Sequence, residues 1–366
     1  MRRSVTVIVP AHDEEEGLPA TLRSVLGQTV PPEQVIVVDD ASGDRTGDVA
    51  RSYGVQVLRP PRNLGSKARA QNYALPHCTS DLVLAVDADT VLAEDYIERI
   101  VPAFEDPAVV VAAGNVQTRF TRTVWERGRS VEYLFGFHWH RPIQQRADSP
   151  MVCSGCCSVF RREALVGFGG FPERTIVEDM DFTWSQQIAG RRARYVGEAV
   201  AWAADPETLL YLRKQVWRWM AGFCQNVRLH TGQLIRRKPI LAVWVLLAML
   251  EILTAPLWWS APILMTVWLG HGVVPTLLWW LGAELVFTLP PLVYAARKRK
   301  LRLRDVLLDI PCVYPAKVVN LWYAWKAVAV ELVLVPLRLS KGLTVYEKGR
   351  GPAVPSLGPS SRASPA

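Results

Sequence analysis

Two aspartates, Asp87 and Asp89, follow an apolar run in the segment "LAVDADTVL" (residues 84–92). In an extended chain, the side chains of residues i and i+2 point the same way, so both carboxylates can face one cation. Paired carboxylate oxygens suit Mg²⁺ or Mn²⁺, which in turn can hold the phosphates of a substrate. Two acids in a solvated turn are the simpler interpretation of such a short motif.

Acids also follow two other apolar runs: "PAHDEE" comes after the first run and "DDASGD" after the second. The runs that predict strands are Val5–Val9, Val35–Val38, Val55–Leu58 and Leu82–Val86, and helix-like segments separate them at residues 17–26, 46–51, 67–75 and 93–99. This alternation predicts an open, mostly parallel α/β sheet. Ligands of such sheets bind beyond the carboxyl ends of the strands, so we expect the acids to meet at one edge.

A second, strongly apolar region covers residues 240–296, where only Glu251 and Glu284 are charged. Its length suits a hairpin of two membrane spans with a break near Gly270–Gly272. Basic residues flank it on both sides, at 236–238 and 297–304, so the positive-inside rule predicts a multi-pass protein of the cell membrane whose N-terminal domain is cytoplasmic. At membrane depth the two glutamates are expected to be paired, interfacial or functional.

These patterns divide the chain into a cytoplasmic domain (1–238), a transmembrane hairpin (239–296), a basic segment with interfacial helices (297–345) and a disordered tail (346–366). The net charge of +8 is concentrated at the membrane edge, where anionic lipid attracts it, and therefore does not indicate nucleic-acid binding. The six cysteines have no zinc-finger spacing and are interpreted as small buried thiols.

Seven blocks in order resemble family-2 glycosyltransferases, the inverting enzymes that use nucleotide sugars: "VTVIVPAHDEE", "VIVVDDASGDRT", "NLGSKARAQNYAL", "DLVLAVDADTVL", "CSGCCSVFRREAL", "VEDMDFTWSQQIAG" and "QVWRW". The last two are similar to the E-D and Q-x-x-R-W motifs of the membrane-embedded branch. That branch includes hyaluronan, chitin, cellulose and poly-N-acetylglucosamine synthases and ceramide glucosyltransferases. The resemblance covers residues 4–222 and implies a Rossmann-like, GT-A type domain.

The resemblance also implies a role for each matching residue. Asp179, supported by Glu178, would be the general base that deprotonates the acceptor hydroxyl, and Asp89 with Asp87 would bind Mg²⁺ or Mn²⁺. The residues expected to bind the substrates are Pro10, Ala11, Glu14, Asp39, Asp40, Lys67, Asp87, Gln215, Arg218 and Trp219. Ser66 is an insertion relative to the family pattern and weakens the assignment of Lys67.

The expected activity is transfer of a sugar from a UDP-sugar to a growing polysaccharide or oligosaccharide. Transfer of one sugar to a lipid acceptor is the alternative, and two spans are few for a polymer channel unless the protein forms a homo-oligomer or has an export partner. UDP-N-acetylglucosamine and UDP-glucose are the leading donors by family analogy. A nucleotidyltransferase is less favoured because "PAHDEE" contains no glycine-rich phosphate loop, and the retained acids argue against a silent membrane scaffold.

Overall fold

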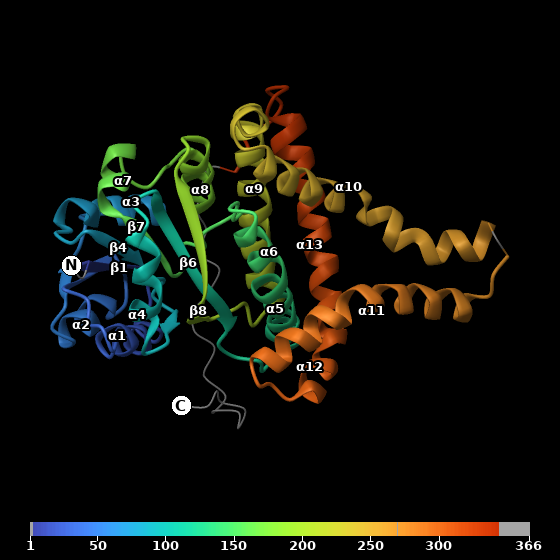
Figure 1. Cartoon of the computed structure of the whole chain (residues 1–366), viewed down its shortest axis with the longest axis horizontal. Coiled ribbons are helices and arrows are strands. Elements are labelled where there is room, and N and C mark those ends of the chain that lie inside the picture. Colours follow the sequence, from blue (N-terminus) through green and yellow to red (C-terminus); the bar gives the residue numbers. More distant parts are fainter. Residues whose placement is uncertain (1–2, 269, 344–366) are drawn as a thin grey trace.

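The computed structural model describes residues 3–268 and 270–343, and the predicted disordered tail (346–366) lies outside the described residues. An α/β domain lies at one end, a group of packed helices follows, and a long helical hairpin projects from the other end (Figure 1). The strands of the domain are β1 (Val5–Ala11), β2 (Gln34–Asp39), β3 (Gln56–Leu58), β4 (Leu82–Ala85), β5 (Val91–Leu92), β6 (Val109–Thr118), β7 (Ser158–Arg161) and β8 (Arg192–Ala203).

These strands form one mixed sheet in the order β3-β2-β1-β4-β7-β6-β8-β5. The first four pair in parallel, as the alternating pattern predicts, and β6 pairs in parallel with β8. In contrast, β7 runs antiparallel to both β4 and β6, and β5 runs antiparallel to β8. The reversed β7 has a consequence for the site, because its incoming loop reaches the edge where β4 ends and Asp87 N–H donates to the Cys156 carbonyl at 3.2 Å.

The sheet is buried on both faces, as its continuous β-branched runs predict. Val7 and Val9 point into one hydrophobic cluster, and Ile8 between them points into the other. The helices of the domain are α1 (Leu18–Leu26), α2 (Thr46–Ser52), α3 (Lys67–Ala74), α4 (Tyr96–Ile100), α7 (Arg162–Phe168) and α8 (Glu178–Ile188). The first four of these agree with the helical segments expected from the sequence.

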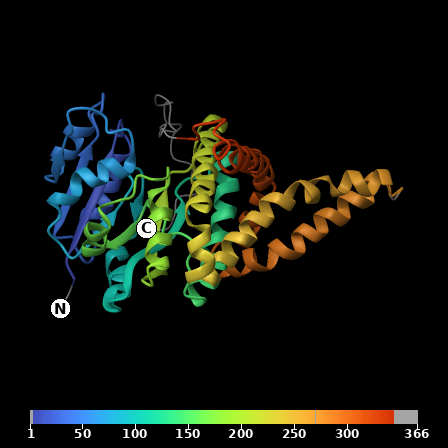
Figure 2. The same cartoon turned by 90° about the horizontal axis from the view of Figure 1, so that it is seen from above.

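The group of packed helices lies beside the sheet. The long helix α9 (Leu209–Arg237) packs against α8 and against α13 (Val313–Ala327), and α13 also packs against α5 (Val124–Phe135). Figure 2 shows α9, α5 and α13 standing together between the sheet and the hairpin. The remaining helices of this part are α6 (Arg141–Arg146) and α12 (Leu303–Asp309), with single turns at Ile310–Cys312 and Gly136–His140 and a last turn at Val328–Leu334.

The hairpin consists of α10 (Pro239–Trp268) and α11 (Val273–Lys298), with the chain reversing between them where the sequence predicts the break. Both helices are long and apolar enough to cross a membrane, and they expose large apolar side chains such as Leu257, Val267 and Phe287. Two apolar helices are weak support for membrane insertion by themselves, so the topology stays a prediction. In both views the hairpin extends away from the rest of the molecule (Figures 1 and 2).

Candidate active site

A cavity of about 1390 Å³ opens at the edge where β1, β2 and β4 end and continues between α5, α9 and α13 toward the hairpin. It exceeds the usual size of a pocket for one small ligand, roughly 300–1,000 Å³, so a donor and an acceptor both fit. Twelve of the thirteen residues expected from the sequence line it: Pro10, Ala11, Glu14, Asp40, Lys67, Asp87, Asp89, Glu178, Asp179, Gln215, Arg218 and Trp219.

Asp39 is the exception, because its side chain points away from this cavity into the domain. It is fully buried, its Oδ2 accepts a hydrogen bond from Arg59 Nη1 at 2.5 Å, and its Oδ1 accepts one from the backbone N–H of Ser42 at 3.0 Å. The neighbouring Asp40 does line the cavity and accepts the backbone N–H of Leu64 at 2.8 Å. Burial raises the pKa of Asp40 against this hydrogen bond. Of the two adjacent acids, the structure therefore places only Asp40 where it can contact a ligand.

Lys67 joins the acids of the cavity. It begins α3 after the N-cap residue Ser66, and its Nζ forms an ion pair with Asp87, lies 3.9 Å from Glu178 Oε1 and donates to the Gly155 carbonyl at 2.9 Å. Burial lowers the pKa of Lys67, but Asp87 and Glu178 outweigh it and leave that pKa raised. The lysine is therefore a fixed cation at the centre of the acids, in spite of the inserted serine.

Glu178 and Asp179 begin α8, where the partial positive charge of the helix N-terminus favours anions. Asp179 is held by two backbone N–H groups, since its Oδ2 accepts from Gly155 at 2.7 Å and its Oδ1 from Met180 at 2.7 Å. Burial raises the pKa of both acids, that of Glu178 to about 7 even with Lys67 nearby. A buried carboxylate whose pKa is shifted toward neutrality suits a general base.

The third acid of this segment, Asp181, has a structural role instead. It is fully buried, forms an ion pair with Arg174 at 2.6 Å and contacts His230 Nε2 at 2.8 Å. His230 belongs to α9, so this contact fastens α8 to α9. Because Asp181 is held by these two partners and is not among the residues that line the cavity, it is a helix N-terminal acid and not a candidate base.

The acids of the cavity fit a divalent metal ion whose remaining ligands come from the bound substrate. Among the described residues there is no group of three or more His, Cys, Asp or Glu side chains that could hold a metal ion by themselves. Asp87 and Asp89 nevertheless both face the cavity, as the i, i+2 spacing predicts. Mg²⁺ is commonly bound by one or two carboxylates together with substrate phosphates, so this pair suffices if the donor supplies the remaining oxygens.

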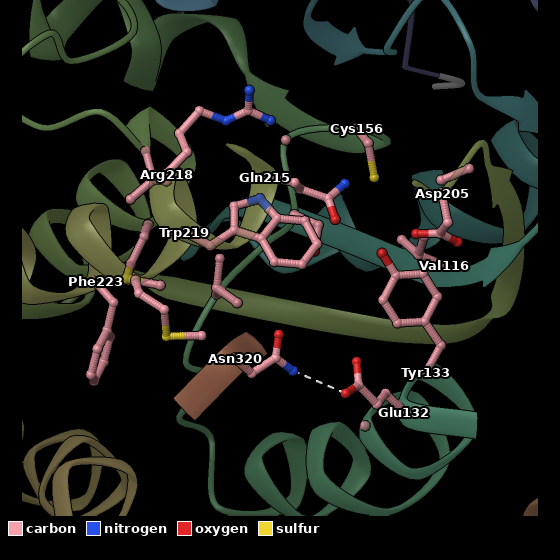
Figure 3. A pocket seen from close by; sticks show the side chains of 18 of the residues that line it. Val116, Glu132, Tyr133, Cys156, Asp205, Gln215, Arg218, Trp219, Phe223 and Asn320 are labelled. Atoms are coloured by element: carbon pink, nitrogen blue, oxygen red, sulfur yellow. Dashed lines mark hydrogen bonds between the residues drawn. The ribbon is translucent and has the colours of Figure 1, made fainter. Parts of the chain in front are cut away.

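Gln215, Arg218 and Trp219 line the other side of the cavity from the first turns of α9 (Figure 3). Arg129 of α5 lies behind them: its guanidinium is 5.0 Å from the centre of the Trp219 ring, and its Nη2 donates to Gln215 Oε1 at 3.4 Å. Arg129 also forms an ion pair with Glu132 at 2.6 Å. One buried arginine thus fixes both the indole and the amide that face the cavity.

The cavity continues to the base of the hairpin, where Glu251, Trp258 and Glu284 line it. Glu284 forms an ion pair with Lys317 of α13 and accepts the indole N–H of Trp258 at 3.1 Å. Pairing is one of the three expectations for these glutamates, and it holds for Glu284. Glu251 lies at the cavity surface.

Comparison with known proteins agrees with this geometry. Residues 6–167 match the family described as glycosyl transferase family 2. This match covers most of the strands of the α/β domain, so the domain is similar to members of that family. An N-acetylglucosaminyltransferase of Rhizobium meliloti is 32% identical over 65% of this chain and 60% of its own length. A poly-beta-1,6-N-acetyl-D-glucosamine synthase of Staphylococcus aureus is 27% identical over 60% of this chain.

The chain spans 60% and 54% of the lengths of these two relatives, so the similarity concerns a little over half of each. A mannosyltransferase of Pyrobaculum calidifontis, solved with GDP-Man and Mn²⁺, superposes with a TM-score of 0.62 over 88% of both chains at 24% identity. This likeness includes the region beyond residue 167 and confirms the GT-A type fold.

Several residues of the candidate site were not expected from the sequence. Gly155 supplies both a carbonyl to Lys67 and an N–H to Asp179, although "CSGCCS" indicates only a close backbone approach in general. Arg129, Tyr133 and Asp205 occupy the side of Trp219, and Tyr133 and Asp205 line the cavity. None of these three belongs to a short motif, and only the folding of α5 beside the segment that leads into α9 brings them together.

Proposed function

We propose that this chain is a membrane-bound inverting glycosyltransferase that moves N-acetylglucosamine from a UDP-sugar to a hydroxyl of a growing polysaccharide or oligosaccharide. The observation that carries the proposal is the single cavity in which Lys67, Asp87, Glu178 and Asp179 lie on one side and Trp219 on the other. The same cavity is therefore bordered by a cation that can bind a diphosphate, by a candidate base and by an aromatic ring that can contact a sugar.

Asp179 takes the proton of the acceptor hydroxyl as that oxygen attacks the anomeric carbon of the donor. Its two backbone hydrogen bonds fix the carboxylate, and its raised pKa increases its strength as a base. Attack from the face opposite the leaving nucleoside diphosphate inverts the anomeric centre, so no nucleophile from the enzyme is needed. Glu178 stands beside Asp179 and keeps Lys67 in place.

The leaving UDP gains negative charge, which cationic groups of this side of the cavity must stabilise. Lys67 is rigidly placed for this task, and Arg218 can grip phosphate oxygens in a bidentate manner. A Mg²⁺ or Mn²⁺ ion held by Asp87 and Asp89 would neutralise the diphosphate further. The nucleoside would be surrounded by residues at the ends of β1 and β2, namely Pro10, Ala11, Glu14 and Asp40.

The choice of N-acetylglucosamine rests on the two relatives, both of which are named for this sugar. The placement in the membrane rests on the two apolar helices and on the basic residues that flank them. With both flanks on the cytoplasmic side, the cavity opens where UDP-sugars are available, and its deep end lies between the two apolar helices, beside Trp258 and Glu284.

Transfer to a lipid-linked acceptor is the second candidate, and the extent of the cavity favours it. The space that begins at Asp179 continues to Trp258 and Thr288 on the apolar helices α10 and α11. An acceptor whose anchor remains in the membrane could therefore place its hydroxyl near the base. Both candidates use the same donor side and the same base, and they differ in the length and anchoring of the product.

A two-step experiment tests the proposal. Detergent-solubilised protein is first incubated with a panel of UDP-sugars, with and without Mn²⁺, and released UDP is measured. We expect release with UDP-N-acetylglucosamine that depends on the metal; absence of release across the panel contradicts the proposed activity. The labelled product is then sized: a ladder of oligosaccharides supports chain growth, and a single sugar in the lipid fraction supports the second candidate.

A further inference from the structure

Asp205 is a buried acid on the acceptor side of the cavity that no motif marks. It follows β8, immediately before the turn that leads to α9, and lines the cavity although its side chain and backbone together are only 5% exposed. Within residues 3–268 and 270–343, the hydroxyls of Thr118 and Tyr133 lie near the carboxylate, but neither of its oxygens accepts a hydrogen bond of normal geometry. A buried acid without hydrogen bonds is costly, so this arrangement requires an explanation.

The neighbours of Asp205 hold it in place without satisfying it. Arg129 Nε lies 4.0 Å from its Oδ1, beyond hydrogen-bond range, and that arginine is already engaged by Glu132. The hydroxyl of Tyr133 points toward the carboxylate (Figure 3). Burial raises the pKa of Asp205 to about 6 against the lowering influence of Arg129 and of the Thr118 and Tyr133 hydroxyls. The acid is thus ionised at neutral pH with two oxygens able to accept hydrogen bonds.

The surroundings indicate the class of ligand. The ring of Trp219, the ring of Tyr133 and the amide of Gln215 border the cavity beside Asp205 (Figure 3). Flat apolar faces suit the C–H face of a sugar ring, and a carboxylate suits its hydroxyl donors. A phosphate would be repelled by Asp205 and Glu132, and a cation would compete with Arg129, which already lies between these acids.

We propose that Asp205 accepts hydrogen bonds from hydroxyl groups of the acceptor saccharide while Trp219 and Tyr133 contact its ring. The inference rests on the proposed function and adds a specificity residue to it. It assigns Asp205 to the acceptor and not to the donor because Arg129 links this acid to Gln215 and Trp219, whereas the groups proposed to bind UDP lie around Lys67.

The test separates acceptor binding from donor binding. Asp205→Asn keeps the shape and one acceptor oxygen, and Asp205→Val removes both oxygens at similar volume. With UDP-N-acetylglucosamine as donor and β-1,4- or β-1,6-linked N-acetylglucosamine tetramers as acceptors, we expect the acceptor KM to rise about tenfold for Asp205→Asn, as loss of a charge-assisted hydrogen bond implies, and further for Asp205→Val. The donor KM and the UDP release without acceptor should stay within about twofold of the wild type, since a charge-assisted contact is lost only on the acceptor side.

Glu207→Gln is the matched control. Glu207 precedes α9 in the same turn but is not among the cavity-lining residues, and it lies 3.8 Å from Arg122, so its substitution should leave both KM values unchanged. An unchanged acceptor KM in both Asp205 variants, or donor hydrolysis that no tetramer stimulates in the wild type, overturns the assignment of Asp205 while the donor chemistry stands. Absence of UDP release from the wild type with every donor overturns the proposed function itself.

Discussion

Lys67 is the residue that allows three carboxylates to share one small region. Asp87, Glu178 and Asp179 would repel one another in a site removed from water, and each would take up a proton more readily. The Nζ of Lys67 contacts Asp87 and lies near Glu178, and the same nitrogen bonds Gly155, whose N–H holds Asp179. The lysine therefore sets both the charge and the position of the proposed base.

Substitution of the base tests its role. Asp179→Asn keeps the size of the side chain but cannot take a proton, so we expect kcat for transfer to fall by roughly 10²-fold or more. The Kd for the UDP-sugar should change little, because Asp179 is assigned to the acceptor hydroxyl. Transfer rates and calorimetric donor titrations measure the two quantities. Retention of most of the turnover would show that another group accepts the proton.

The rate should also depend on pH in a direction that the buried acids determine. Burial raises the pKa of Glu178 to about 7 and that of Asp179 above its ordinary value, and both must be deprotonated for the proposed role. Activity is therefore expected to be present above neutral pH and to fall as the pH falls through this range. Lys67 lowers both pKa values, so Lys67→Met should move the fall in activity to higher pH.

This shift is measured as the pH dependence of UDP release at saturating donor, normalised for each protein to its own maximum. Arg69→Met is the control, because Arg69 lies on the same helix but forms its ion pair with Glu173 at 2.8 Å outside the cavity. A normalised profile that is the same for Lys67→Met and the wild type would mean that the lysine does not tune the base.

Single residues differ in how far the sequence predicts them. Asp87 and Asp89 are assigned to one surface by alternation along an extended chain, and both line the cavity, but the chain turns at residues 87–90, where Thr90 N–H donates to the Asp87 carbonyl at 3.0 Å. The aspartates Asp39 and Asp40 obey the same rule, so only one of them can face the cavity, and the sequence does not tell which. Asp205 was missed because Arg129 and Tyr133, which surround it, belong to α5, about 70 residues earlier in the chain.

At the scale of elements, the close contact between α9 and the segment before α8 fixes the distance between acceptor and base. Gly222 makes this contact possible, because a Cβ atom built there would lie 2.5 Å from Val177 Cγ2 and 2.9 Å from Ile176 Cγ2. Val177 is the residue immediately before Glu178 and Asp179. The helix that carries Trp219 therefore rests directly on the start of the helix that carries the proposed base.

Gly222→Ala should separate these two elements. The added methyl group cannot fit without a shift of Val177, so we expect transfer to fall by about tenfold or more and the melting temperature to fall, as overpacking costs typically 1–3 kcal/mol. Gly232→Ala is the matched control on the same helix, where a Cβ atom meets nothing within 4 Å. That change should stabilise the helix slightly. Equal behaviour of the two variants would contradict the proposed contact.

The first four strands and helices could be predicted because each is a short, locally marked unit with a β-branched run or an apolar periodicity. The second half of the sheet could not. β6 and β8 contain alanine and glycine and are held mainly by their pairing with each other, and the antiparallel direction of β7 depends on contacts with β4 and β6. Pairing between strands that are far apart in the sequence cannot be predicted from a short stretch of it.

At the scale of the whole molecule, one ion pair ties the hairpin to the body. Glu284 of α11 contacts Lys317 of α13 and accepts a hydrogen bond from Trp258 of α10, so three helices meet at this point. A charge among apolar helices is stable only with such partners. The helix α13, within the segment 297–345 predicted to be interfacial, packs on α5 and α9, and its position relative to a bilayer stays a prediction.

Removing only the cation of this ion pair should destabilise the hairpin more than removing both charges. Lys317→Met leaves the Glu284 carboxylate without its cation, and we expect a lower melting temperature in detergent. The double variant Lys317→Met with Glu284→Gln should recover part of the loss, since the glutamine can still accept from Trp258. Thermal unfolding of the wild type, both single variants and the double variant measures the coupling. Additive effects would show that the two side chains do not stabilise each other.

The length of α9 has a mechanical consequence. The helix runs from Leu209 to Arg237, 29 residues without a proline and about 43 Å long. Gln215 and Trp219 lie near its start, and only Lys238 separates its end from the hairpin. An unbroken rod transmits tilt from one end to the other. If the hairpin spans a bilayer as proposed, a change in bilayer thickness that tilts it would move the indole relative to the carboxylates, and the rate of the proposed transfer would depend on the lipid.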